Sequence, residues 1–360
     1  MAQRTQRFED PTLELAVRAA LSKPRGGLLK EDLRRLTSLQ AGDRGIRSIN
    51  GLQPCVNLSS LSLYWNRISD LKPLSRLHKL EMLLLQKNEI CSLLALSDLS
   101  SLLHLSLSGN CIADLAPLSG LPRLYSLGLG DNRVVGLTPL SKLMSLESLQ
   151  LDNNSVANLQ PLRGLPRLSA LSLRANQLEN VAPLSALGGL RTLNVSENRG
   201  LRADPLSELT QIISLKLDCN GMTDLAPLSG LTHLRALSLN FNGIADLHPL
   251  AGLSGLRMLE LRGNCIVNIA PLSTMTNLVC LVLDQNQIVD LTPLSDLRHL
   301  HHLRANYNRI TGIAPLLRCD GLRRRSTVML KGNPVDTRRA GTASKTIAAL
   351  GERGVRVVAL

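Results

Sequence analysis

The chain has 360 residues, of which 44% are hydrophobic but only 2% are aromatic. An ordinary globular core contains more aromatic side chains, so the composition predicts an interior filled by aliphatic residues. The formal net charge of +13 suggests an acidic partner, but residues 298–360 alone hold 13 Lys and Arg against three Asp and Glu. The excess is therefore terminal, which argues against a uniformly basic binding surface.

The N-terminal segment, residues 1–45, is predicted to be a helical cap. Residues 11–21 and 30–39 have apolar spacing suited to short helices, and a degenerate repeat frame begins at Gly45 and Ile46. The first residues lack the apolar region of a signal peptide, and no stretch approaches the roughly 18 apolar residues of a membrane span. We therefore expect a cytoplasmic protein that does not contact a membrane.

Asparagine then recurs twelve times from Asn66 to Asn308 at one constant spacing, without insertion or deletion, at positions 66, 88, 110, 132, 154, 176, 198, 220, 242, 264, 286 and 308. The frame around it is LxxLxLxxNxIxxLxPLxxLxx, and its proline position is filled in every repeat except at Ala95. This assigns residues 46–316 to leucine-rich repeats, with twelve full repeats from about residue 58.

Each repeat is expected to open with a short strand such as Leu61 to Leu63, whose leucines point inward. The Asn then turns the chain, and its buried amide satisfies backbone groups of neighbouring turns. Pro73 and Leu74 start a short convex segment of 3₁₀ or irregular structure. Stacked repeats predict an α/β fold, a leucine-rich-repeat horseshoe solenoid with a parallel β-sheet on its concave face.

One repeat departs from this frame. Gly200 stands in its Ile position and Ala203 in its next Leu position, with Leu201 displaced by one residue. We expect a looser convex turn over residues 199–204, with weaker protection from hydrogen exchange than in the flanking turns.

Residues 317–360 are predicted to form a C-terminal capping segment. Val328 to Leu330 with Asn333 match a last strand and turn offset by three residues, residues 343–351 have a helical pattern, and residues 355–358 suggest an edge strand. This end also carries a basic cluster, made up of Arg318, Arg323, Arg324, Arg325, Lys331, Arg338 and Arg339.

Seven cysteines occur, at positions 55, 91, 111, 219, 265, 280 and 319. No CxxC pair is present, and their spacing does not indicate a disulfide framework or a zinc site. We therefore interpret all of them as reduced thiols, which also favours the cytoplasm.

The motif NxIxDLxPLxxL stands almost whole at Asn66–Leu77, Asn110–Leu121, Asn220–Leu231 and Asn242–Leu253. With the preceding FEDPTLELAVRAAL and the closing GNPVD and IAALGERGVRV segments, the chain resembles internalin-like bacterial leucine-rich-repeat proteins. It shares its 22-residue repeat type with the leucine-rich-repeat regulatory subunit of protein phosphatase-1. The resemblance implies a horseshoe fold with a helical N-terminal cap and protein binding through the concave face.

Two columns of residues, two and one before each Asn, are predicted to face a partner. Four of the six aromatic residues fall in them, and aromatic side chains dominate interface hot spots. Between the aromatic positions lie small residues such as Gly130 and then charges of alternating sign, which predict a partner of mixed charge. The candidate partner-binding residues are Tyr64, Trp65, Lys87, Asp131, Asp152, Arg174, Glu197, Asp218, Phe241, Arg262, Asp284 and Tyr307.

No catalytic residue, cofactor, metal or small-molecule substrate is expected. Cys280 and His302 occupy the same position in adjacent repeats, but the pattern supplies no third ligand or oxyanion donor. We expect a non-catalytic scaffold or regulator with a protein partner. Two alternatives stay open, a secreted or surface adhesin of internalin type and a binder of an acidic or nucleic-acid partner through the basic C-terminal end. We do not expect nucleic acid, because no aromatic residues interleave with that cluster.

Overall fold

The computed structural model describes residues 5–338 and 341–359. The chain divides into two compact units. Unit 1 runs to Gln177 and includes Ala186–Leu190, and unit 2 comprises Leu178–Ser185 together with the chain from Arg191 onward. Both are built from the same repeat, and each is described by itself.

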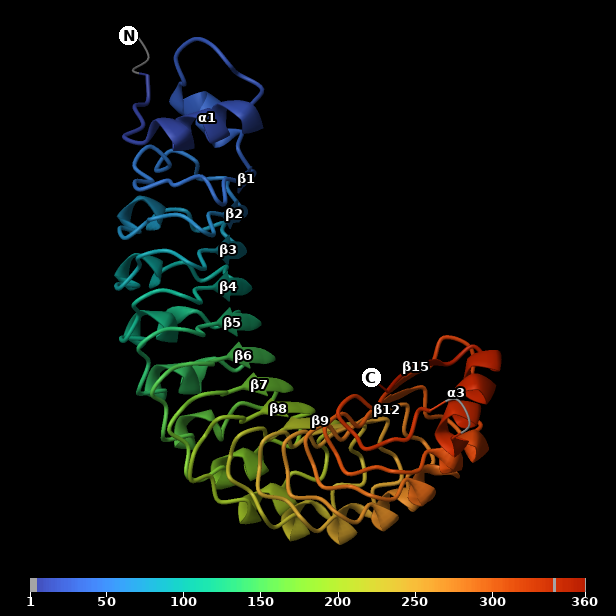
Figure 1. Cartoon of the computed structure of the whole chain (residues 1–360). Coiled ribbons are helices and arrows are strands. Elements are labelled where there is room, and N and C mark those ends of the chain that lie inside the picture. Colours follow the sequence, from blue (N-terminus) through green and yellow to red (C-terminus); the bar gives the residue numbers. More distant parts are fainter. Residues whose placement is uncertain (1–4, 339–340, 360) are drawn as a thin grey trace. The chain divides into compact units, whose positions relative to one another are not determined.

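Unit 1 begins with helices α1 (Pro11–Ala20) and α2 (Lys30–Arg34). Its strands are β1 (Ser38–Gln40), β2 (Ser60–Ser62), β3 (Met82–Leu84), β4 (His104–Ser106), β5 (Ser126–Gly128), β6 (Ser148–Gln150) and β7 (Ala170–Ser172). From β1 to β7 each strand pairs in parallel with the next, and residues at equivalent repeat positions are partners. Figure 1 shows these strands on one side of the unit and the convex segments on the other.

The first expected helix, residues 11–21, is confirmed as α1, whose N-cap Asp10 accepts hydrogen bonds from the N–H groups of Thr12 and Leu13. The second expected helix, residues 30–39, is wrong beyond Arg34. Residues 38–40 form β1 instead, because the exposed backbone edge of β2 supplies hydrogen-bond partners that a helix end would lack. The cap predicted to be helical therefore also contributes a strand.

Unit 2 contains strands β8 (Thr192–Asn194), β9 (Ser214–Lys216), β10 (Ala236–Ser238), β11 (Met258–Glu260), β12 (Cys280–Val282), β13 (His302–Arg304), β14 (Thr327–Met329) and β15 (Arg356–Val358). From β8 to β15 each strand pairs in parallel with the next. The strand, helix and edge strand expected within residues 317–360 are confirmed as β14, helix α3 (Thr342–Glu352) and β15. Asn333 also takes up the repeat role, because its Oδ1 accepts the N–H of Ile310 at 3.1 Å.

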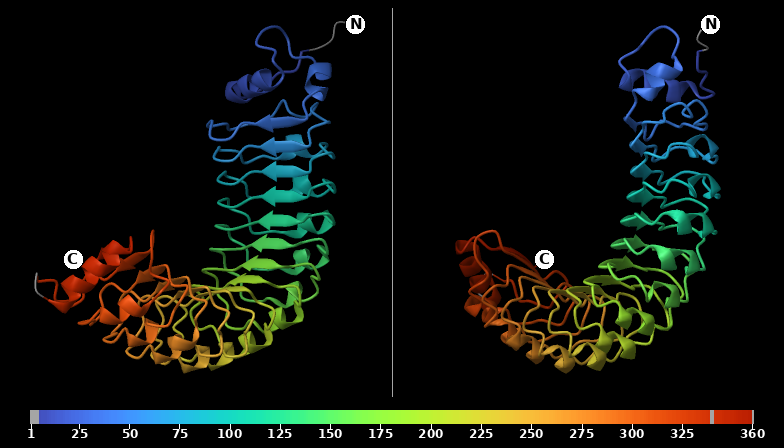
Figure 2. Two further views of the ribbon diagram at one scale, coloured as in Figure 1. Left: turned by 90° about the vertical axis from the view of Figure 1, so that its right-hand side faces the viewer. Right: turned by 180° about the vertical axis from the view of Figure 1, so that it is seen from behind.

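The convex segments are short 3₁₀ turns, as predicted. Proline stands at the first or second position of most of them, where its fixed φ suits a helical start and its missing N–H costs nothing. They are Lys72–Leu74, Leu94–Leu96, Ala116–Gly120, Thr138–Lys142, Gln160–Leu162, Ala182–Ala186, Asp204–Glu208, Ala226–Leu228, His248–Leu250, Ala270–Thr274, Thr292–Leu294 and Ala314–Arg318. Figure 2 shows the turns of each unit on the side opposite its strands.

The interior of each unit is a continuous aliphatic core, as the composition predicts. The central strand leucines align in register, as Leu237 does with Leu259 and Leu281. These three side chains are almost fully buried. Because a single repeat has no second face against which to bury such leucines, each repeat depends on its neighbours for stability.

A ladder of asparagine side chains connects successive repeats. Nδ2 of Asn264 donates to the carbonyl of Leu261 in its own repeat at 2.9 Å and to Leu239 in the preceding repeat at 3.0 Å. Its Oδ1 accepts the N–H of Ile244 at 3.1 Å, and the amide is buried. The same three bonds recur at Asn88, Asn110 and most other repeats, which confirms the predicted structural role of the Asn.

The turn changes at the irregular repeat. Gly200 adopts a φ of +90°, and Leu201 turns inward to become nearly buried. Oδ1 of Asn220 accepts the N–H of Asn198 at 2.7 Å, just as Oδ1 of Asn242 accepts the N–H of Asn220 at 3.1 Å in a regular repeat. An added bridge between Asn180 and Arg202 joins the neighbouring turns. The looser turn expected at residues 199–204 stays a prediction for hydrogen exchange.

Candidate functional site

The strand side of each unit is called its concave face here. Three columns of side chains point outward on it with the period of two that a strand imposes, at positions six, four and two before each Asn. In the repeat of Asn264 these residues are Met258, Glu260 and Arg262, while the intervening Leu259 and Leu261 are buried. The sequence predicted the last column and the edge residue beside it, but not the first column.

The edge column, one residue before each Asn, has left-handed backbone. Trp65, Lys87, Phe241 and Tyr307 all have φ between 55° and 58°. A non-glycine residue pays roughly 1–2 kcal/mol for this conformation, and the ladder bonds on either side hold it in place. The turn therefore directs these side chains along the edge of the concave face.

Three of the four aromatic side chains of these columns lie across glycines of adjacent repeats. A Cβ at Gly263 would stand 2.5 Å from Cδ1 of Phe241, and one at Gly332 would stand 2.5 Å from Cδ1 of Tyr307. Tyr64 similarly covers Gly42. The solvent-accessible fractions are 38% for Tyr64, 60% for Trp65, 47% for Phe241 and 51% for Tyr307, so all four present apolar surface for contact.

Phe241 is further fixed by a cation. Cζ of Arg262 lies 5.1 Å from the centroid of the Phe241 ring, within the range of a cation–π interaction. Nε of the same guanidinium donates to Oε1 of Gln285 at 3.1 Å. Both side chains are thus preorganised on the face, which lowers the entropy lost when a partner binds.

The predicted acidic residues Asp152, Asp218 and Asp284 have a different role from that expected. Each uses Oδ1 to accept the backbone N–H two residues before the Asn of the next repeat, at 2.9, 2.7 and 2.8 Å. Asp284 is almost fully buried, and its Oδ2 forms an ion pair with Arg304 at 2.8 Å. These carboxylates form a second set of bonds between repeats, so their main role is to hold adjacent repeats together.

The remaining charged candidates lie in the predicted columns. Nζ of Lys87 crosses Gly109 and lies 3.4 Å from Oδ2 of Asp131. Oδ1 of Asp131 also accepts a hydrogen bond from Asn153 at 2.7 Å. Arg174 is exposed and Glu197 is half-buried. Among the charges of alternating sign, Asp284 forms its ion pair with Arg304, while Arg262 donates to Gln285.

Unit 1 carries a shallow hollow on its concave face, over strands β3 to β6. It encloses about 320 Å³ and has Met82, Leu84, His104 and Gly128 in its lining. Serines make up much of the remaining wall, so the hollow follows from the band of small residues in the sequence. Met82, 38% exposed, was missed as a candidate because the first column was not considered.

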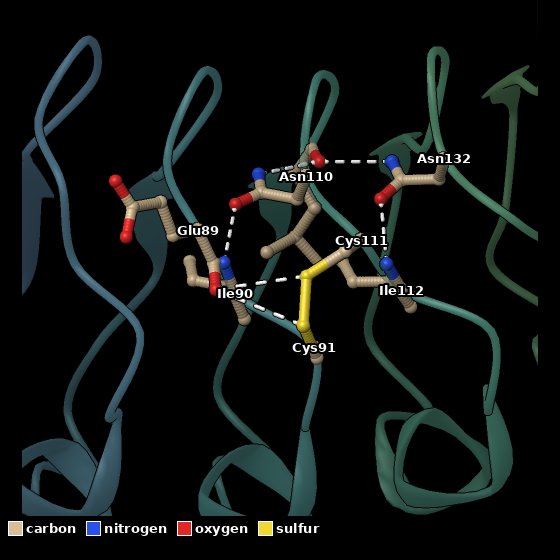
Figure 3. Close-up of a disulfide and its surroundings, with 8 residues drawn as sticks. Glu89, Ile90, Cys91, Asn110, Cys111, Ile112 and Asn132 are labelled. Atoms are coloured by element: carbon tan, nitrogen blue, oxygen red, sulfur yellow. Dashed lines mark hydrogen bonds between the residues drawn. A yellow bond between two sulfur atoms is a disulfide. The ribbon is translucent and has the colours of Figure 1, made fainter.

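Two of the seven cysteines are joined, which overturns the interpretation of all of them as reduced thiols. Cys91 and Cys111 form a disulfide between adjacent repeats. Their separation of 20 residues is the offset of the asparagine ladder, in which Oδ1 of Asn110 accepts the N–H of Ile90 (Figure 3). The pairing was overlooked because partners were sought only at equivalent positions of adjacent repeats.

A solved internalin of Listeria monocytogenes, InlF, matches the chain at 34% identity with a TM-score of 0.82. The match covers 87% of this chain and 94% of the internalin. The chain belongs to the internalin-like leucine-rich-repeat family. A family model for leucine-rich repeats, in two copies, matches residues 254–296 of this internalin-like chain. No curated protein matches it.

More distant structures share the fold of this internalin-like chain. A leucine-rich-repeat protein of Leptospira interrogans matches at 24% identity and a TM-score of 0.80, over 89% of this chain and 83% of that one. The ectodomain of a plant receptor kinase from Arabidopsis thaliana matches at 24% identity and a TM-score of 0.73, over 91% of this chain and 42% of that one. Leucine-rich-repeat proteins of this kind serve as protein-interaction modules and are typically non-catalytic.

The catalytic alternative gains no support from Cys280 and His302 of the internalin-like chain, although their Cα atoms are register partners. Nδ1 of His302 lies 2.9 Å from Oγ1 of Thr327, so the ring contacts the following strand. Burial, followed by the charge of Glu260, raises the pKa of the Cys280 thiol, which opposes thiolate formation. Within residues 5–338 and 341–359, no three His, Cys, Asp or Glu side chains are grouped to hold a metal.

The basic C-terminal cluster is spread over several elements. Arg323, Arg324 and Arg325 are exposed in the loop before β14, and Arg338 is paired with Asp336 at 2.8 Å. Arg339 lies outside the described residues. None of the helices that the structure describes is sufficiently long and apolar to cross a bilayer.

Proposed function

We propose that this internalin-like chain binds a protein partner on its concave face, as a non-catalytic scaffold or regulator. The observation that carries the proposal is the arrangement of Phe241, exposed on the face and fixed between Gly263 and Arg262. Rigid exposed aromatics with a neighbouring Arg are the side chains that most often supply the energetic centre of an interface. The Arabidopsis receptor ectodomain was solved in complex with Casparian strip integrity factor 2, which supports macromolecular binding as a use of this fold.

A photo-cross-linking amino acid at position 241 tests the proposal, with the same substitution at Val267 as the control. Val267 is similarly exposed, at 54%, but follows its Asn by three residues and so lies off the concave face. We expect position 241 to cross-link a protein that position 267 does not. The purified partner should then bind the Phe241→Ser variant at least about tenfold more weakly than the Val267→Ser variant. Equal affinity for the two variants would reject the concave face as the binding surface.

A secreted or surface adhesin is the second candidate, and the Cys91–Cys111 disulfide favours it. Structural disulfides persist in oxidising compartments and are rare in the cytosol. The cysteines therefore no longer favour the cytoplasm. A cytoplasmic location stays a proposal, beside an extracellular one. Rapid alkylation of thiols in intact producing cells, followed by mass spectrometry, distinguishes them. A linked Cys91–Cys111 peptide supports the extracellular location, and two alkylated cysteines support the cytoplasm.

A further inference from the structure

The carboxylates on the concave face of unit 2 are occupied by internal bonds. Oδ1 of Asp218 accepts the hydroxyl of Ser238 at 2.6 Å and the N–H of Asn240 at 2.7 Å. Oε2 of Glu260 accepts from the same Ser238 hydroxyl at 3.1 Å and from the amide of Asn240 at 3.0 Å. Together with the buried Asp284, these acids form part of the floor of the face and offer few acceptors to a partner.

Cations stand outward on the same face and beside its edge. Lys216 on β9 and Arg257 just before β11 are exposed, and neither has an ion-pair partner among the residues that the structure describes. Arg304 keeps 53% of its side chain exposed although it pairs with Asp284. Arg262 is half-buried and lies against the ring of Phe241. The free polar groups that a partner meets are therefore mainly donors with positive charge.

Apolar side chains are interspersed with these cations. Met258 directly follows Arg257 and is 43% exposed, and Phe241 is 47% exposed. Strands β10, β11 and β12 bring these rows together, since Met258 pairs in register with Ala236 and Cys280. Neighbouring strands lie about 4.8 Å apart, so a cation and an apolar contact recur within one or two strand spacings.

We propose that the concave face of unit 2 takes an acidic protein segment in which carboxylates flank aliphatic or aromatic side chains. Carboxylates would meet Lys216, Arg257 and Arg262, and the apolar side chains would pack on Met258 and Phe241. Arg presents a fork that binds carboxylate in a bidentate manner, which gives both affinity and register. This inference rests on the proposed concave-face function and revises the expected mixed-charge partner, because the acids of the alternation already accept hydrogen bonds from the next repeat.

The test uses two labelled synthetic peptides of repeated Glu-Glu-Leu or Lys-Lys-Leu triplets, titrated with the full chain in a fluorescence anisotropy assay. One variant combines Lys216→Gln, Arg257→Gln and Arg262→Gln. Its matched control combines Arg323→Gln, Arg324→Gln and Arg325→Gln, which removes the same charge from the loop before β14. Five of the six side chains are exposed and Arg262 is half-buried, and unchanged melting curves establish that both variants fold.

We expect the acidic peptide to bind, the basic peptide not to bind, and the concave variant to lose affinity by about tenfold or more while the control changes by less than about twofold. An equal or larger loss in the control would place acid binding at the C-terminal end and overturn the inference. Binding of the basic peptide that Phe241→Ser abolishes would also overturn it, while leaving the concave face as a docking surface. Retention of the acidic peptide by both the concave variant and Phe241→Ser would reject the inference together with the docking surface.

Discussion

The ring of Phe241 lies across Gly263 of the following repeat so closely that a Cβ at position 263 would stand 2.5 Å from Cδ1 of the ring. Tyr307 and Gly332 repeat the relationship. At Phe241 and Tyr307 the aromatic residue of the edge column is thus accommodated by a glycine at the equivalent position of the following repeat, and each pair of positions forms one structural element of the candidate site.

Gly263→Ala is expected to displace the Phe241 ring and to destabilise the protein. Gly221→Ala is the matched control, because Gly221 has a φ of +73° against +69° for Gly263 but has no atom near its missing Cβ. Both substitutions should cost about 1 kcal/mol for the left-handed backbone, and only Gly263→Ala should add a collision cost of roughly another 1 kcal/mol. Urea denaturation measures both costs, and equal values would show that the ring moves aside freely.

Asn264→Ala should lower the free energy of unfolding by about 2 kcal/mol, since it leaves the buried N–H of Ile244 without its acceptor and removes one of the two amide bonds that the carbonyls of Leu239 and Leu261 each accept. Asn277→Ala removes a single exposed bond to the carbonyl of Ser254 and should change stability by less than about 0.5 kcal/mol. Chemical denaturation of the two variants provides the comparison. Similar stabilities would mean that water replaces the ladder at little cost.

Replacing both Cys91 and Cys111 by Ser should lower stability by about 2–3 kcal/mol under non-reducing conditions, because the disulfide closes a loop in the unfolded chain. Cys265→Ser removes an exposed free thiol and should have no measurable effect. Added dithiothreitol should abolish the difference between the double variant and the native chain. A difference that persists in reductant would indicate that the serines perturb packing.

Thiol labelling should separate the free cysteines by burial and pH. Burial raises the pKa of Cys55 to about 12 and that of Cys319 to about 11, whereas Cys265 is exposed. At pH 8 a disulfide reagent should modify Cys265 rapidly and the two buried thiols only after unfolding, since the thiolate is the reactive form. Mass spectrometry of digests taken over time identifies the modified residues.

The same pKa shifts give a sign for the pH dependence of stability. A thiol whose pKa is raised in the folded state stabilises the fold fully below its unfolded pKa, near 8.5, and loses that contribution as pH rises toward 11–12. The free energy of unfolding should therefore fall between about pH 9 and pH 11, and less steeply in Cys55→Ala when denaturation is repeated across this range. An equal slope in the variant would assign the alkaline loss to other groups.

The repeat period made most of the fold predictable. A constant repeat length places Asn, Leu and Pro at fixed positions, and the period of two within each strand decides which leucines are inside. The second predicted helix continued too far because apolar residues such as Leu36 and Leu39 fit a helix and a strand edge equally well over a few positions. Pairing with β2 decided between them, and that contact is not visible in local sequence.

The candidate site was predicted only in part, for physical reasons. Tyr64, Phe241 and Tyr307 were found because aromatics are rare in this chain and follow the period of the repeat. The bonds of Asp152 and Asp284 to the next repeat were not predicted. An acid that faces solvent and an acid that accepts a backbone N–H occupy the same position of the repeat, so the sequence does not distinguish them. The Cys91–Cys111 pair was missed because cross-repeat contacts after the Asn run at an offset of 20 residues, which only the backbone path reveals.

That offset also bears on how such chains change length. Each ladder amide bonds to the backbone of the preceding repeat. The ladder can therefore join any two repeats in which the Asn keeps its position. Duplication or excision of one whole repeat keeps the spacing on which the ladder bonds between successive repeats depend. The three extra residues before β14 are absorbed without loss of the ladder bonds of Asn333, whereas an insertion between a strand and its Asn would leave that turn without its amide and would turn strand leucines toward solvent.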